Sequence, residues 1–219
     1  MISRQTGIRH EPSPVGRCAP FGDMEFGGVT MPFDRNAEVY GEGEPADYVY
    51  KVVSGSVRAY KVLSDGRRQI TAFYLPGDVF GIETGDEHSN SAEAIDQSTI
   101  LVVRRSSVLS TADRDGEVAR HLLSITVAEL KRTQNHALLL IKTAKERIAA
   151  FLLEMSERMT GKGCVELPMS RQDIADYLGL TIETVSRTLT QLSEVSTIQF
   201  LASRRIVLRD PSQLNALNA

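Results

Sequence analysis

The sequence predicts an α+β protein built in three parts: an all-β roll, one long helix, and a small helical domain that ends in a β-hairpin. Three observations lead to this prediction. Short runs rich in β-branched and aromatic residues, separated by glycine-containing turns, occupy residues 21–103. From residue 113 the apolar residues recur every three or four positions, and neither Gly nor Pro occurs over 117–160. Two short helical segments joined by a glycine turn follow.

Composition places the chain among ordinary globular proteins. Its 219 residues carry a formal charge of -3, and 42% of them are hydrophobic. No apolar run approaches the roughly 18 residues of a membrane-spanning helix, so we expect no membrane association. Residues 1–20 are polar and contain proline, which predicts a mobile extension rather than a secretory signal. The predicted location is the cytoplasm.

The residues that usually hold metals and cofactors are sparse. Cys18 and Cys164 are the only cysteines, too few for a four-cysteine zinc or iron–sulfur site, and they suit a reducing compartment. The four histidines lack the spacing of a metal-binding pair, and neither a glycine-rich nucleotide-binding loop nor a G-x-S-x-G motif occurs. We therefore expect no metal, no cofactor and no catalytic residue.

The first part, residues 21–112, is predicted to form a β-roll. The sequence Ser-Asp-Gly at 64–66 is typical of a hairpin turn, and Pro-Gly-Asp at 76–78 is typical of another turn. Short strands at this spacing favour a barrel or jelly roll over a parallel sheet with crossover helices. The clearest strand-forming runs lie at 48–53, 57–62, 69–74, 79–82 and 98–103.

The second part, residues 113–142, is predicted to be a dimerisation helix. A helix over 113–141 would be about 43 Å long, so it would overhang a small roll. It carries two apolar stripes, which indicate two partners, the parent roll and a second copy of the helix. The spacing alone does not decide which stripe does which, and both could pack on the parent roll. The first stripe contains Val118, Leu122 and Ile125, and the predicted dimer seam contains Leu123, Val127, Leu130, Ala137 and Ile141.

The third part, residues 143–219, holds the most specific pattern. Ser170 begins a capping-box-like start in which Asp173 stands in place of Glu. The helix that follows ends at Gly179, and Thr181 caps the next helix. Helix, glycine turn, helix and β-hairpin is the pattern of a winged helix-turn-helix, whose second helix enters the DNA major groove. The predicted elements are helices over 144–159, 172–178 and 182–194 and strands over 197–201 and 205–208.

The alternative for this part is an αα-hairpin without a role in DNA binding. The second helix argues against it, because its outward positions are polar while Val185, Leu189 and Leu192 face inward. The charge count is weak support for DNA binding, since residues 143–219 contain nine Lys or Arg and nine Asp or Glu. The basic residues would have to gather on one face, and the candidates are Arg171, Arg187, Arg204 and Arg205.

The sequence resembles the CRP/Fnr family of bacterial transcription regulators over about residues 25–210. Within that family, YGEGEPAD at 40–47 is similar to the FixK branch. The resemblance implies a β-roll, a dimerising helix and a winged helix-turn-helix, in a homodimer that binds a DNA palindrome and contacts RNA polymerase. The loop at 64–68 is a candidate for that contact. The shared motifs are LPGDVFG at 75–81, AKERIAAFLL at 144–153, LPMSRQDIADYLGL at 167–180 and TIETVSR at 181–187.

The FixK branch implies an activator of microaerobic, denitrification or nitrogen-fixation genes, controlled by its own abundance. Arg187 is the candidate for a bidentate contact to guanine, and Glu183 can accept a hydrogen bond from a cytosine amine and orient Arg187. CRP-type members carry Arg where Ile182 stands and Gly where Ser186 stands, so the resemblance implies a TTGA-type half-site with Ser186 facing a thymine. Phosphate contacts are expected from Ser170, Arg171, Thr181, Thr184, Ser203 and Arg204.

Three departures from the family bear on function. The chain lacks the four cysteines of the Fnr iron–sulfur cluster, and 87–92 lacks the Arg with which CRP holds cyclic AMP, so neither ligand is expected. Gating by another small effector in the roll, or by oxidation of Cys164, stays open. A cupin-like metalloenzyme would need several ligands where the roll offers only His88. Residues 194–197 lack the family's usual Gly, so a positive φ there would shift the wing slightly.

Overall fold

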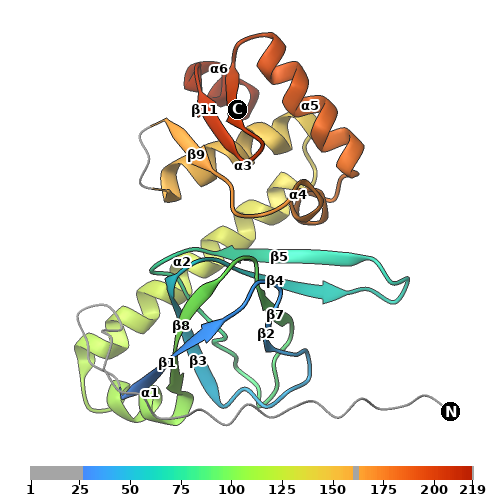
Figure 1. Ribbon diagram of the computed structural model, residues 1–219. Helices are drawn as coiled ribbons and strands as arrows, with labels where there is room; N and C mark the ends of the chain where they lie inside the picture. The colour runs from blue at the N-terminus through green and yellow to red at the C-terminus, as the bar shows by residue number, and fades with distance from the viewer. Residues whose placement is uncertain (1–26, 160–162, 219) are drawn as a thin grey trace, which may run out of the picture.

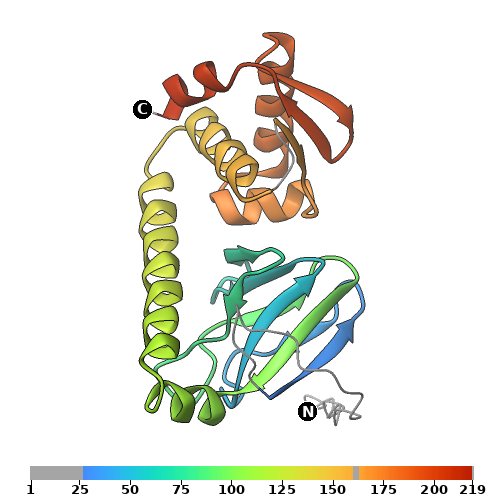
Figure 2. The ribbon, with the colours of Figure 1, turned by 90° about the vertical axis from the view of Figure 1, so that its left-hand side faces the viewer.

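In a computed structural model, the chain is described over residues 27–159 and 163–218. Figures 1 and 2 show a β-roll at one end and a C-terminal domain at the other, joined by a long helix along one side. The extension predicted over 1–20 lies outside the described residues. The α+β class and the order of the three parts agree with the prediction.

The roll consists of two four-stranded sheets, and every strand pair in them is antiparallel. This arrangement confirms the predicted jelly roll. The first sheet contains, in spatial order, β1 (Gly28–Phe33), β8 (Ser98–Arg104), β3 (Tyr48–Ser54) and β6 (Val79–Phe80). The second contains β2 (Glu38–Tyr40), β7 (Ser91–Ala94), β4 (Val57–Val62) and β5 (Arg68–Tyr74).

Aromatic side chains fill the space between the two sheets. The ring centroids of Tyr50 and Tyr74 lie 5.3 and 4.9 Å from that of Phe80. The His88 ring stacks on Tyr40 at 3.6 Å between centroids, and His88 is buried. The interior of the roll is therefore a packed hydrophobic core.

Two helices cover the outer face of the first sheet. These are α1 (Arg105–Ala112), which the sequence analysis missed, and α2 (Gly116–Leu139). The predicted long helix is shorter at both ends, because Asp113 closes α1 and the Asp115 carboxylate accepts a hydrogen bond from the N–H of Glu117. The segment RSSVLSTA of α1 has one buried residue, Val108, and too little apolar periodicity to predict a helix.

The two stripes of α2 have different surroundings. In the first stripe Val118 is buried, and Leu122 and Ile125 pack against the roll. The second stripe faces away from the roll, so the alternative in which both stripes pack on it is wrong. The exposed residues are Leu123, Val127, Leu130 and Ala137 of α2, together with Ile141 just beyond its end.

The C-terminal domain is a winged helix-turn-helix, as predicted, with a three-stranded antiparallel sheet in the order β10-β11-β9. Thr143 and Glu146 form a capping box that starts the domain's first helix after α2. Neither β9, which is three residues long, nor α6 was predicted from the sequence. The elements are α3 (Ala144–Arg158), β9 (Cys164–Glu166), α4 (Arg171–Leu178), α5 (Ile182–Glu194), β10 (Ile198–Ala202), β11 (Arg205–Leu208) and α6 (Pro211–Asn218).

Among the described residues, no helix combines the length and apolarity needed to cross a membrane. The same part of the chain has no group of three or more His, Cys, Asp or Glu residues placed to hold a metal ion.

Candidate nucleic-acid interface

The helix-turn-helix is assembled around a left-handed glycine. Gly179 has φ 61°, a conformation that a side chain would disfavour, and it ends α4. Arg147 of α3 donates a hydrogen bond of 2.7 Å to the carbonyl of Leu178, one of the last carbonyls of α4. Ala175 is fully buried, and the side chain of Thr181 caps α5. The turn between the two helices is thus held by capping residues close in the sequence and by Arg147 from α3.

The recognition helix α5 has one buried and one exposed face. Glu183 and Arg187 are exposed, while Ser186 is half-buried beside them. Within the described part of the chain, neither charged side chain makes a hydrogen bond or ion pair, so the predicted orientation of Arg187 by Glu183 is not seen. Both groups face solvent near the start of α5. The inward residues Val185, Leu189 and Leu192 are buried, as expected.

Four of the predicted phosphate-contacting residues lie around one hollow between the start of α4 and the wing. The cavity measures about 160 Å³. Phe200 lines it, and the Arg171 guanidinium lies 5.5 Å from the centroid of that ring. Ser170 and Arg171 at the start of α4 therefore share one surface with Ser203 and Arg204, which lie 33 positions further along the chain. The four rim residues are Ser170, Arg171, Ser203 and Arg204.

The hydroxyl groups at this surface differ in what they can donate. Ser170 donates to the carboxylate of Asp173 at 2.7 Å, so its only proton is engaged in capping α4. The hydroxyls of Thr181 and Thr184 lie 3.0 Å apart and share one hydrogen bond, which leaves one of their two protons free. Arg204 donates to the carbonyl of Pro168 at 3.0 Å, which holds the wing against the segment before α4.

The turn from α5 to the wing contains the strained residue that the sequence suggested. Ser196 has φ 58°, in the left-handed region that glycine normally occupies. The N–H of Thr197 donates to the carbonyl of Leu192 at 3.0 Å, a bond that closes the helix end. The C-terminal cap of α5 therefore has the usual hydrogen bond, but Ser196 occupies the position that normally holds glycine.

The even charge count of the third part hides an uneven distribution. Asp173 and Asp176 of α4 face the roll, where they pair with Arg68 of β5, and Asp173 also pairs with Arg58 of β4. These carboxylates are therefore neutralised by the first domain. Sequence reasoning missed Arg58 and Arg68, because no local pattern links them to α4.

Two family models match the chain in succession. Residues 30–115 match the cyclic nucleotide-binding domain, and residues 146–217 match the Crp-like helix-turn-helix domain. Together with the fold, they define a transcription regulator with a helix-turn-helix DNA-binding domain.

The most informative comparison is with individual relatives, which show the branch of the family. The chain is 50% identical over 198 residues to the nitrogen fixation regulation protein FixK of Azorhizobium caulinodans, covering 88% of this chain and 80% of that protein. It is 46% identical over 181 residues to FixK of Rhizobium meliloti, covering 82% of each. The solved structure of FixK2 from Bradyrhizobium japonicum has a TM-score of 0.85 and 52% identity, covering 88% of this chain and 98% of that one. The chain belongs to the CRP/Fnr family, in its FixK branch, and this confirms the prediction of a regulator rather than an enzyme.

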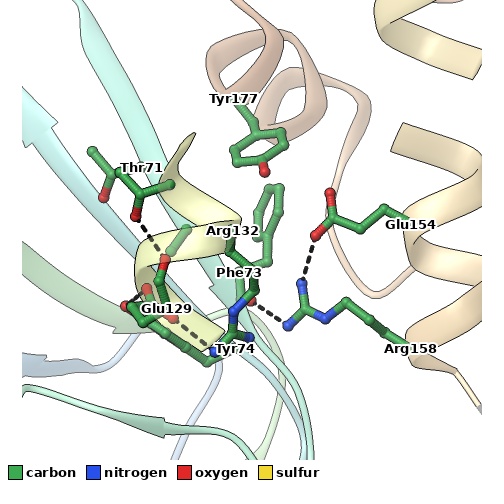
Figure 3. A pocket seen from close by; sticks show the side chains of 10 residues that line it. Thr71, Phe73, Tyr74, Glu129, Arg132, Glu154, Arg158 and Tyr177 are labelled. Atoms are coloured by element: carbon green, nitrogen blue, oxygen red, sulfur yellow. Dashed lines mark hydrogen bonds and ion pairs between the residues drawn. The ribbon is translucent and has the colours of Figure 1, made fainter. Parts of the chain in front are cut away.

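The match to cyclic nucleotide-binding domains implies a ligand that these residues do not fit. Aromatic rings fill the roll, and residues 87–92 contain no Arg to bind a phosphate. Figure 3 shows the hollow where β5, α2, α3 and α4 meet, and its cavity of about 20 Å³ has room for about one water. Arg132 and Arg158 line it, but both are paired with carboxylates, namely those of Asp78, Glu129 and Glu154.

Proposed function

We propose that the chain acts in the cytoplasm as a homodimer that binds a TTGA-type palindrome and activates transcription through contact with RNA polymerase. It works without a cyclic nucleotide or an iron–sulfur cluster. The target genes serve nitrogen fixation, in keeping with the names of the FixK relatives, or a related microaerobic process such as denitrification.

The second stripe of α2 supports the dimer. Leu123, Val127 and Leu130 are each more than half exposed on a helix whose other stripe already packs against the roll. Large apolar side chains in a row at helical spacing are costly to expose, and a second copy of the same helix covers them in coiled-coil fashion. A twofold axis through this seam would place the two α5 helices on one side of the dimer.

The main support for DNA binding is the exposed polar face at the start of α5. Arg187 and Glu183 lie one helical turn apart, exposed and unpaired within the described residues, where a recognition helix contacts base edges. Arg187 suits guanine, Glu183 suits the cytosine amine, and Ser186 between them suits thymine. Arg171 and Arg204 supply charge for phosphates, with Ser203, Thr181 and Thr184 as neutral donors. Ser170 is the weakest member of that set, because its proton is already donated.

The test is selection of duplexes from a random pool with the purified, untreated protein in reducing buffer. The expected result is an inverted repeat of TTGA half-sites, bound by a dimer without any added effector. Selection of a GTGA-type repeat, or of no sequence at all, would refute the specificity. Loss of binding on mild oxidation, and its retention in Cys164→Ser, would instead support control through the half-buried free thiol of Cys164.

A further inference from the structure

The contact between the roll and α4 is a network of charged hydrogen bonds. Nη2 of Arg68 lies 2.7 Å from Asp173 and 2.8 Å from Asp176, and its Nε donates to Asp176 at 2.9 Å. Nη1 of Arg58 reaches both oxygens of Asp173, at 3.2 and 3.3 Å, while Nη2 of the same residue holds Glu93 at 2.8 Å. Planar guanidinium groups that bridge several carboxylate oxygens permit little rotation.

Further contacts hold the other end of α4. The His136 ring of α2 stacks on Tyr177 with centroids 4.1 Å apart, and its Nε2 lies 2.8 Å from the Tyr177 carbonyl. Gln69 of β5 donates to the same carbonyl at 3.3 Å. Arg158 of α3 donates to the carbonyl of Phe73 and to Asp78 in the roll. Helix α4 is therefore held along its length by the roll and by α2.

Asp173 belongs to the DNA-binding domain and to this contact at the same time. One carboxylate oxygen accepts from the N–H and the hydroxyl of Ser170, which starts α4, and the other accepts from Arg68. Burial raises the pKa of Asp173, but the hydrogen bonds from Ser170 and the charges of Arg58 and Arg68 outweigh it, so this pKa lies below its ordinary value. The carboxylate stays ionised, and both its oxygens stay engaged, throughout the physiological range.

We propose that Arg58 and Arg68 are positioning residues that set the half-site spacing the regulator accepts. This inference rests on the proposed dimer and its palindrome. The covalent link from α2 to α3 is short, residues 140–143, and acts as a pivot. The charged network is a second connection between the roll with α2 on one side and the C-terminal domain on the other. With both in place, α5 keeps one orientation relative to the dimer helix, and the two recognition helices keep one separation.

The first test compares Arg68→Ala with Arg67→Ala. Arg67 is the matched control, because it is an adjacent arginine whose only ion pair among the described residues is with Asp65 in its own exposed turn. Each variant is titrated against a TTGA palindrome and against palindromes with the spacer one or two base pairs longer or shorter. Bivalent binding depends on geometry, so a changed spacer should weaken the wild type and Arg67→Ala about 100-fold. Arg68→Ala should lose less than about tenfold on the same change, and bind single half-sites as the wild type does.

The second test needs no DNA. Hydrogen exchange followed by mass spectrometry should show amides in 140–147 and 170–178 exchanging at least about threefold faster in Arg68→Ala than in the wild type or Arg67→Ala. Arg68→Gln, which keeps one donor amide, serves as a second variant if the alanine protein is poorly folded. An unchanged spacing preference in Arg68→Ala would overturn the inference, whatever the exchange rates. If the wild type binds no palindrome, the proposed function fails, and the exchange result alone decides whether the network holds the domains together.

Discussion

At the scale of single residues, Arg187 and Arg171 have the same charge but different surroundings. Arg187 is exposed on the face of α5 that we propose contacts bases, while the Arg171 guanidinium lies over the ring of Phe200. Arg187→Ala should weaken the binding free energy for the palindrome by about 2–6 kcal/mol, because each of the two subunits loses one bidentate guanine contact. Arg171→Ala should weaken specific and scrambled duplexes alike, and lower the salt dependence by about one phosphate per subunit. Titrations at several salt concentrations separate the two, and equal weakening of both duplexes by Arg187→Ala would make it a phosphate anchor.

His88 is buried in the roll, and its protonation is expected to affect the free energy of unfolding. Both ring nitrogens lack a hydrogen-bond partner among the described residues. Burial lowers the pKa of His88, although the carboxylates of Glu83 and Glu44 oppose the shift. The unfolded chain takes up this proton near pH 6.5, before the folded protein does, so the free energy of unfolding should fall as the pH drops below about 6.5.

The test of that prediction is His88→Phe. This substitution keeps the stacking on Tyr40, which lies 3.6 Å away, and removes the titrating group. Melting temperatures measured between pH 8 and pH 5 should fall less steeply in the variant than in the wild type. Parallel curves would show that His88 is not the group responsible.

At the scale of elements, a substitution in the exposed stripe of α2 tests the proposed dimer seam. Leu130 is 56% exposed, so Leu130→Glu should leave each protomer folded while it places a pair of carboxylates in the seam. We expect a monomer in sedimentation, with affinity for the palindrome reduced at least about 100-fold because each subunit then binds one half-site. Ala128→Glu, an exposed position on the opposite side of the same helix, is the control and should remain dimeric. A dimeric Leu130→Glu protein would place the seam elsewhere.

The end of α5 allows a stability test at the same scale. Ser196 has φ 58°, so Ser196→Gly should stabilise the protein by about 1 kcal/mol by removing the strain of a side chain there. Ser193→Gly, inside the helix, should destabilise it by about 0.5–1 kcal/mol. Denaturant unfolding measures both. Opposite signs are expected, and a destabilised Ser196→Gly would mean that the serine side chain contributes more than its strain costs.

At the scale of the whole molecule, the filled roll leads to a ligand prediction. Aromatic rings occupy its interior, and the arginines at the junction of the domains are already paired. Cyclic AMP should therefore leave the melting temperature unchanged, whereas a bound ligand at a hundredfold excess over Kd would stabilise the protein by about 2.7 kcal/mol. The purified protein should also lack the visible absorption of an iron–sulfur cluster. A rise in melting temperature with cyclic AMP, or such an absorption band, would contradict the cofactor-free proposal.

The helix-turn-helix could be predicted from the sequence because its signals are local. Ser170 and Asp173 lie three residues apart, Gly179 ends α4, and Thr181 starts α5, so each signal acts within one or two helical turns. The long helix and the strands β3, β4, β5, β6 and β8 followed from local patterns for the same reason, whereas β1, β2 and β7 of the roll were not predicted. Where the local signal was weak or short, as in α1 and β9, the prediction failed.

The tertiary structure alone decided which way the charges and the apolar stripes face. Arg58 and Asp173 are 115 residues apart in the chain, and nothing in either neighbourhood marks them as a pair. This contact and the two ion pairs of Arg68 turn Asp173 and Asp176 toward the roll. The first stripe of α2 packs against the same roll, where Val118 is buried. Burial and ion pairing depend on distances between distant segments, and those distances exist only once the domains have packed together.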